Sequence, residues 1–93
     1  MDFAYQEEQL EEVLEETGNE EFKQLVVLND DHNTFDHVIN TLIKVCKHTP
    51  EQAEQCTWII HYKGKCSVKE GSYHELKPLR DAIREEGIGA VIS

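Results

Sequence analysis

The acidic residues of this 93-residue chain are concentrated at its start. Residues 1–22 contain nine Asp and Glu residues and no Lys or Arg, whereas residues 23–93 contain ten acidic and nine basic residues. A segment of like charges with few apolar residues cannot bury enough apolar surface to offset the entropy lost on ordering. We therefore expect residues 1–22 to form a flexible acidic extension and residues 23–93 to form one core domain.

Charge and cysteine content argue against several classes of function. The formal net charge is −10, which disfavours nucleic acid and anionic membrane surfaces as partners, because both select basic patches. No apolar run is long enough to span a bilayer, and the acidic start does not resemble a secretory signal, so we expect a cytoplasmic protein. Three cysteines without a pairing motif favour reduced thiols. A monomer is the default expectation.

The beginning of the core is typical of a strand followed by a helix. Residues 25–28 form a short apolar and β-branched run, which predicts a buried strand. Apolar residues then recur at spacings of three and four between Phe35 and Cys46, which predicts an amphipathic helix. Asn33 and Thr34 are both suitable N-caps for this helix.

A strong helix-start signal follows at Thr49. Thr49 and Gln52 form a capping box, and Pro50 suits the first helical position. Gly64 suits the C-terminal cap of this second helix. The residues expected on its buried stripe are Ala53, Cys56, Ile59 and Ile60.

A second capping box, formed by Ser72 and Glu75, predicts a third helix that ends at Gly87. Pro78 lies inside this pattern, so we expect either a kink or a later start. The residues expected to face inward are Leu76, Leu79, Ala82 and Ile83.

Two further short runs complete the predicted fold. Residues 66–68 and residues 88–92 are each predicted to form a strand. The order is then strand, helix, helix, strand, helix, strand. This order predicts an α/β (α+β) two-layer sandwich, in which three helices pack on one face of a three-stranded sheet.

Two adjacent carboxylates, Asp30 and Asp31, follow Asn29 at the end of the first strand. One interpretation is a turn that caps the next helix. A second is a divalent-metal or phospho-acceptor site, although the acidic and lysine residues that such domains place after later strands are not visible. A third is cation capture, because an acidic rim beside an apolar helix face can hold an ammonium group by charge-assisted hydrogen bonds.

His61 is the other candidate, because it follows the apolar residues 58–60 near the end of the second helix. A lone histidine there is more often structural than a ligand. Cys46, Cys56 and Cys66 lack metal-binding spacing, and neither a phosphate loop nor a paired nucleophile and base is visible. We therefore expect neither catalysis nor a cofactor or metal. The remaining histidines are expected to be exposed (His32, His37) or to flank helix ends without function (His48, His74).

Several segments together resemble the ClpS adaptor family. They are residues 28–31 (Leu-Asn-Asp-Asp), 35–39 (Phe-Asp-His-Val-Ile), 54–55 (Glu-Gln) and 60–65 (Ile-His-Tyr-Lys-Gly-Lys), and the similarity extends over residues 24–93. The resemblance implies an adaptor of the bacterial N-end rule. Such adaptors bind substrates that begin with Leu, Phe, Tyr or Trp and deliver them to a Clp AAA+ unfoldase and its peptidase. Related domains occur in some eukaryotic ubiquitin ligases, but no other ligase part is visible, so we expect the free-standing bacterial type.

The resemblance also implies roles for matching positions. Asn29 and His61 would hydrogen-bond the substrate α-amino group, while Asp30 and Asp31 would supply negative charge around it, Asp30 more directly. Lys77 would contact the N-terminal domain of the unfoldase. The hydrophobic pocket for the first side chain would be lined by Asn33, Thr34, Phe35, Val38, Thr57 and Ile60, with Ile88 or Val91 closing it.

Three positions depart from the commonest family pattern. Phe35 stands where a methionine usually limits the pocket width and helps to exclude β-branched side chains. Thr57 replaces a frequent methionine, so we expect a more polar wall there. Ser72 stands where an acidic residue is common on the docking helix. The remaining alternative is a structural interaction domain of similar fold without an amine site, as in ribosomal stalk proteins.

Overall fold

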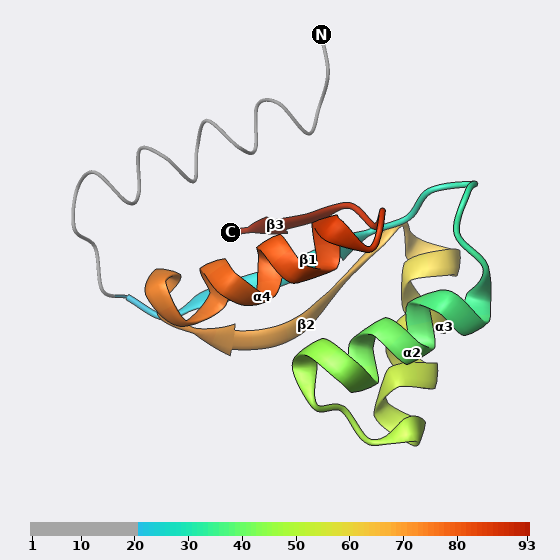
Figure 1. Ribbon diagram of the computed structural model, residues 1–93, viewed down its shortest axis with the longest axis horizontal. Coiled ribbons are helices and arrows are strands. Elements are labelled where there is room, and N and C mark those ends of the chain that lie inside the picture. Colours follow the sequence, from blue (N-terminus) through green and yellow to red (C-terminus); the bar gives the residue numbers. More distant parts are fainter. Residues whose placement is uncertain (1–20) are drawn as a thin grey trace, which may run out of the picture.

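The computed structural model describes residues 21–93, so the acidic extension expected at residues 1–22 lies almost entirely outside the described residues. The predicted order of elements and the α/β class are confirmed (Figure 1). The elements are β1 (Lys23–Leu28), α2 (Phe35–Cys46), α3 (Pro50–Lys63), β2 (Lys65–Gly71), α4 (Tyr73–Glu85) and β3 (Ala90–Ile92).

The first strand, β1, is the centre of a three-stranded antiparallel sheet with the order β2-β1-β3. Leu28 at the end of β1 pairs with Lys65 at the start of β2. On the other side, the Leu28 N–H donates to the Gly89 carbonyl at 2.9 Å, just before β3 begins. The end of β1 is therefore held between the two edge segments, and the polar residues that follow it are fixed at that end of the sheet.

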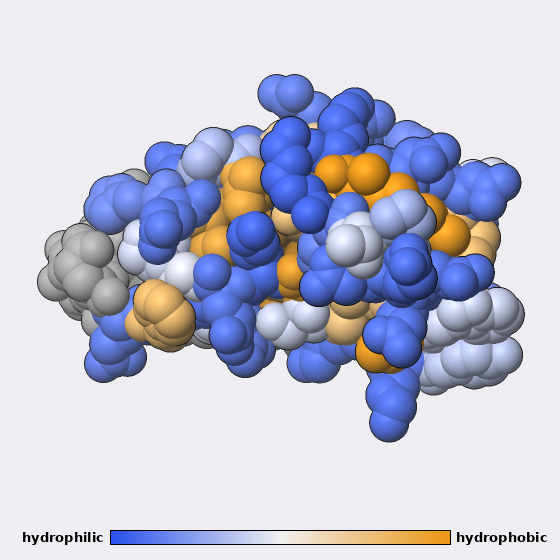
Figure 2. Space-filling view, turned by 90° about the horizontal axis from the view of Figure 1, so that it is seen from below, coloured by the Kyte–Doolittle hydropathy of each residue, from blue (hydrophilic) through white to orange (hydrophobic). Residues whose placement is uncertain are grey.

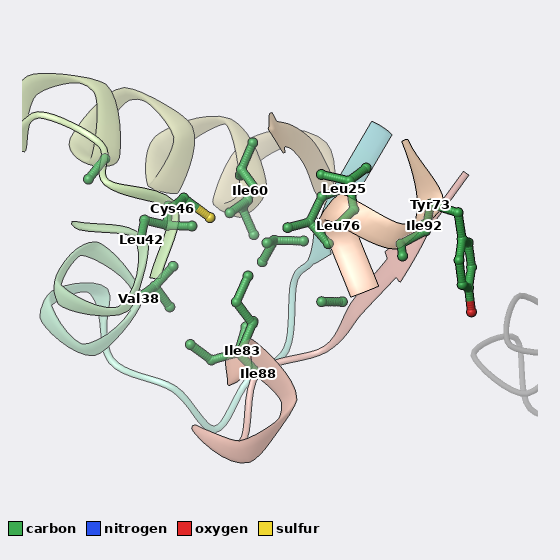
Figure 3. Close-up of a cluster of buried hydrophobic side chains, with 14 residues drawn as sticks. Leu25, Val38, Leu42, Cys46, Ile60, Tyr73, Leu76, Ile83, Ile88 and Ile92 are labelled. Atoms are coloured by element: carbon green, nitrogen blue, oxygen red, sulfur yellow. The ribbon is translucent and has the colours of Figure 1, made fainter. Parts of the chain in front are cut away.

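The helices form the second layer. In Figure 1, α4 crosses one face of the sheet, and α2 and α3 lie together beside it. Leu25 and Val27 of β1 are buried in one hydrophobic cluster with Leu42 of α2 and Leu76 and Ile83 of α4. Figure 3 shows that this cluster fills the space between the sheet and the helix pair.

Both edge strands differ in length from the predictions. β2 is longer than the predicted run at residues 66–68, and β3 begins at Ala90 rather than at residue 88. Only Val68 and Gly71 of β2 are buried, because the strand lies at the edge of the sheet and turns its polar side chains to solvent. A strand with so few buried apolar residues carries a weak hydrophobic signal.

The second helix, α3, begins and ends as predicted but buries a different face. The capping box of Thr49 is formed, and Gly64 caps the helix at φ +92°. Thr57 is buried, whereas Ile59 is 40% exposed, so the expectation that Ile59 belongs to the buried stripe is wrong. The stripe that faces α2 and β2 has spacings of four and three: Ala53, Thr57 and Ile60.

The third helix, α4, begins at Tyr73, directly after its N-cap Ser72, and Pro78 lies inside it. The alternative prediction that the helix would start later, because of Pro78, is therefore wrong. Leu76 and Ile83 are buried as expected, whereas Leu79 and Ala82 are only partly buried.

No helix within residues 21–93 is long and apolar enough to cross a bilayer. Figure 2 shows a face of the molecule on which hydrophilic residues predominate and apolar side chains emerge between them.

Candidate functional site

A pocket of about 300 Å³ lies where β1 ends. The last residue of β1, the loop to α2, the first turns of α2, the second half of α3 and the turn before β3 all contribute to it. Ligand pockets usually span about 300–1,000 Å³, so this one suits a single amino-acid side chain better than a large cofactor. The lining residues are Leu28, Asn29, Asp30, Asp31, Asn33, Thr34, Phe35, Val38, Thr57, Ile60, His61 and Ile88.

The structure brings together every residue that the sequence nominated for the amine site and for the hydrophobic pocket. Of the two residues considered for closing the pocket, Ile88 lines it, whereas Val91 is buried in β3 outside it. Lys77 lies on α4, also outside the pocket. Leu28 was missed, although its place as the last apolar residue before Asn29 was a usable signal.

Backbone hydrogen bonding joins the polar ends of β1 and α3. The Asn29 N–H donates to the Gly64 carbonyl at 2.8 Å, one residue beyond the β1–β2 pairing of Leu28 with Lys65. Gly64 caps α3, so the last turn of this helix, which carries His61, is held beside Asn29. Two segments that are distant in sequence thus face one pocket.

The side chain of Asp30 organises the loop between β1 and α2. Its Oδ1 accepts the backbone N–H groups of His32 at 2.8 Å and Asn33 at 2.9 Å, and its Oδ2 accepts the Asn33 side-chain amide at 2.7 Å. Partial burial raises the pKa of the Asp30 carboxyl, but these three donors outweigh it and lower the pKa below its ordinary value of 3.8. Asp30 is therefore an anion at neutral pH, set in the wall of the pocket.

Asn33 connects this loop to the turn after α4. Its side-chain amide donates to Asp30 and also, at 2.9 Å, to the Gly87 carbonyl. His37 on α2 contacts the same turn, because its Nε2 lies 2.8 Å from the Glu86 carbonyl oxygen. His37 is accordingly half-buried rather than exposed as expected. These contacts fix the turn against the loop and so hold Ile88 at the pocket.

The turn after α4 has the geometry of a Schellman motif. Gly87 has a left-handed φ of +83°, and its N–H donates to the Arg84 carbonyl at 2.9 Å. The Ile88 N–H donates back to the Ile83 carbonyl at 3.3 Å. A residue other than glycine at position 87 would be strained in this conformation. The turn reverses the chain and directs Ile88 into the core (Figure 3).

The N-cap of α2 is Thr34, not Asn33, because Thr34 Oγ1 accepts the His37 N–H at 3.1 Å. Thr34 and Asp31 are exposed at the rim of the pocket, and both belong to its lining. His32 is exposed, as expected. The two neighbouring polar residues, Asn33 and Thr34, thus have separate structural tasks beside the site.

The apolar part of the pocket comes from α2, α3 and the turn before β3. Val38, Ile60 and Ile88 are buried, and Figure 3 shows them converging from these three segments. Thr57 is also buried, and its hydroxyl donates to the Ala53 carbonyl at 2.7 Å. The Thr57 hydroxyl hydrogen is therefore bound within α3, and only the acceptor capacity of its oxygen is left for the pocket wall.

Aromatic rings border the pocket on the side of α3. The ring of Phe35 meets that of Trp58 edge-on, with centroids 4.6 Å apart. His61 lies edge-on to both, at 6.1 Å from Phe35 and 6.3 Å from Trp58. His61 is exposed in the last turn of α3, where a hydrogen-bonding imidazole can reach a ligand at the pocket mouth.

The cysteines and the acidic pair give no sign of a metal centre. Within residues 21–93, no group of three or more His, Cys, Asp or Glu side chains is placed to hold a metal ion. Cys46, Cys56 and Cys66 are free thiols outside the pocket lining. Burial raises the pKa of Cys46 to about 11, and burial together with the adjacent Cys56 raises the pKa of Cys66 to about 12.

Comparison with known proteins identifies relatives of this chain. The family model described as "ATP-dependent Clp protease adaptor protein ClpS" matches residues 19–88. The ClpS adapter protein of Synechocystis sp. is 34% identical over 65 residues, which cover 69% of this chain and 66% of that protein. The ClpS adapter protein of Thermosynechococcus vestitus is 32% identical over 65 residues, which cover 69% of each chain.

Two further similarities are to part of a ubiquitin ligase and to a solved structure. The E3 ubiquitin-protein ligase UBR1 of Drosophila melanogaster is 33% identical over 63 residues, which cover 68% of this chain but only 4% of the ligase. Among solved structures, Agrobacterium tumefaciens ClpS2 bound to L-phenylalaninamide has a TM-score of 0.64 and 18% identity. That match covers 81% of this chain and 95% of the other, so the two share a fold.

Proposed function

The chain belongs to the ClpS family of ATP-dependent Clp protease adaptor proteins, and on this basis we propose that it is an N-degron adaptor. It binds the free α-amino group and the bulky hydrophobic first side chain of a substrate, and it delivers that substrate to a Clp AAA+ unfoldase. The main support is the pocket at the end of β1, in which an ionised carboxylate and a histidine adjoin an apolar wall. Its role is to bind, not to catalyse.

The polar rim of the pocket suits a protonated amine. An α-amino group has a pKa near 7.7–8.0, so at neutral pH it is mostly a cation with three N–H donors. Asp30 supplies a negative charge in the pocket wall, and Asp31 adds a second at the exposed rim. Asn29 and His61 supply acceptor atoms from the two segments joined by the Asn29–Gly64 hydrogen bond. N-acetylation removes the charge and most of the donors together.

Magnitudes indicate that both parts of the ligand are needed. Burying an aromatic side chain of about 150–250 Å² at ~25 cal/mol/Å² yields about 4–6 kcal/mol. Each charge-assisted hydrogen bond to the amine adds about 1.5–3 kcal/mol. Association itself costs about 4–15 kcal/mol. This cost is comparable to the gain from either part of the ligand, so neither the amine nor the side chain is sufficient alone.

The first test compares short labelled peptides that differ only in their first residue. Fluorescence anisotropy is expected to give micromolar binding for free N-terminal Phe, Leu, Tyr or Trp, and at least about 30-fold weaker binding for Ala and for N-acetyl-Phe. The Ile peptide reports whether Phe35, at the pocket lining, excludes β-branched side chains. Failure of all free peptides to bind the folded protein contradicts the proposal.

Binding is also expected to depend on pH in a defined window. The pKa of the Asp30 carboxyl in the folded state is below its ordinary value of 3.8. The carboxylate is therefore charged above pH 3.8, and its charge is lost only when the pH falls through this lowered pKa. The substrate amine loses its proton above about pH 8. Affinity should therefore fall about tenfold per unit as the pH rises above about 8.

An anisotropy titration of the Phe peptide at each pH measures this profile. Circular dichroism at the same pH values controls for unfolding. Because His61 lines the same pocket, the titration is repeated with His61→Gln. An affinity that is unchanged between pH 7 and pH 9.5 would mean that the charge of the amine is not recognised.

Delivery requires a second surface on the adaptor. Lys77 on α4 is the residue that we propose for contact with the N-terminal domain of the unfoldase. It lies outside the pocket lining, so docking there leaves the peptide site open.

A further inference from the structure

Two exposed aromatic rings on α3 lie next to the pocket without lining it. The rings of Trp58 and Tyr62 are nearly parallel, with centroids 5.3 Å apart and an interplanar angle of 13°. Trp58 is 44% exposed and Tyr62 is 74% exposed. Large aromatic side chains that gather at the surface commonly mark a site of interaction. We call this pair the α3 platform.

The α3 platform is continuous with the pocket through two shared neighbours. Trp58 contacts Phe35 edge-on at 4.6 Å, and Phe35 lines the pocket. Tyr62 contacts His61 edge-on at 5.3 Å, and His61 also lines the pocket. A ligand that leaves the pocket past Phe35 and His61 therefore meets the platform next.

The geometry of a bound peptide places its second side chain outside the pocket. Consecutive Cα atoms are 3.8 Å apart, and successive side chains of an extended chain point to opposite sides. If the first side chain enters the pocket and its amine faces Asp30, the second points outward at the pocket mouth. The two rings contact Phe35 and His61, which both line the pocket, so they lie within reach of a side chain that points outward there.

We propose that Trp58 and Tyr62 bind the second side chain of an N-terminal peptide and favour a flat one, aromatic or guanidinium. This inference rests on the proposed function and adds a second specificity determinant to it. Aromatic groups pair with ring faces and edges, and a guanidinium stacks on ring faces as a cation. A guanidinium also complements the net charge of −10, whereas an acidic second side chain is repelled by Asp31 and by the same net charge.

The test uses peptides that begin with Phe and vary only at the second residue: Gly, Leu, Trp, Arg or Asp. With the wild-type protein, the Trp and Arg peptides are expected to bind about three- to tenfold more tightly than the Gly peptide. In Tyr62→Ala this ratio should fall below twofold, while the affinity for the Gly peptide stays within about twofold of wild type. The readout is a ratio of affinities, which a change in overall stability does not alter.

Trp58→Ala is expected to reduce the same ratio. It can also change the affinity for the Gly peptide, because Trp58 contacts Phe35. Phe22→Ala is the matched control, since Phe22 is an exposed aromatic residue just before β1, whereas the pocket lies at the other end of that strand. Phe22→Ala should keep the wild-type ratio.

The outcomes separate this inference from the proposed function. If the Gly peptide binds the wild type but the ratio is near one, or if the ratio survives in both Tyr62→Ala and Trp58→Ala, the platform does not bind the second side chain. If Phe22→Ala lowers the ratio as much as Tyr62→Ala does, the inference is also wrong. If no free peptide binds, the proposed function fails, and the inference fails with it.

Discussion

Asp30→Ala is expected to weaken binding of a free Phe peptide at least about 100-fold, the largest effect of any single substitution at the pocket. A charge-assisted hydrogen bond contributes about 1.5–3 kcal/mol, and each 1.4 kcal/mol is a factor of ten in affinity. The same carboxylate accepts two backbone N–H groups and the Asn33 amide. Its removal therefore loosens the loop as well as removing the charge.

Two further variants separate the effect of the lost charge from the effect of the lost hydrogen bonds. Asp30→Asn keeps a side-chain oxygen for the N–H groups of His32 and Asn33 but removes the charge, so an intermediate loss of about tenfold is expected. Asp31→Ala removes an equal charge from the exposed rim and should cost no more than about threefold. Anisotropy measures all three, with circular dichroism as the folding control. A folded Asp30→Ala protein that binds within twofold of wild type rules out the assigned role of Asp30.

The elements that were predicted correctly have local signals at both ends. The capping boxes that begin at Thr49 and Ser72 fix the starts of α3 and α4, and both are formed in the structure. Gly64 and Gly87 adopt the left-handed conformation at the ends of those helices. Such signals depend on neighbouring residues only, so sequence suffices to locate them.

Features that depend on distant contacts were not accessible in the same way. Which face of α3 is buried follows from its packing on α2 and β2. The sequence misplaced Ile59 because Ile59 and Ile60 lie three and four residues after Cys56, and both spacings fit one helical stripe. The hydrogen bond from the Asn33 side chain to the Gly87 carbonyl joins residues that are 54 positions apart in the sequence. No local pattern specifies such a contact.

The candidate site was predictable in its members but not in their arrangement. The polar residues were visible as an unusual run after a strand, and the resemblance to ClpS assigned the apolar positions to the same pocket. Three details came only from the structure: the bound hydroxyl of Thr57, the dual role of Asn33, and the exposure of Tyr62 beside the pocket. Each of these follows from side-chain orientation, which residue type and spacing leave open.

The two adjacent isoleucines of α3 allow a sharp test of this packing. Ile60 is 4% exposed, belongs to the core cluster and lines the pocket, whereas Ile59 is 40% exposed. Ile60→Ala is expected to lower the free energy of unfolding by about 2–4 kcal/mol, because it leaves a cavity that the surrounding helices only partly fill. Ile59→Ala removes the same atoms from a partly exposed site and should cost less than about 1 kcal/mol.

Urea unfolding followed by circular dichroism measures both values, and a shift in midpoint at constant slope identifies a change in stability. A domain of this kind is stabilised by about 5–15 kcal/mol in total, so Ile60→Ala removes a large share of its stability while Ile59→Ala leaves it nearly intact. At temperatures where it remains folded, Ile60→Ala should also bind the Leu peptide more weakly, because part of the apolar wall is missing. Equal destabilisation by the two variants would contradict the burial of α3 described above and, with it, the placement of the pocket wall.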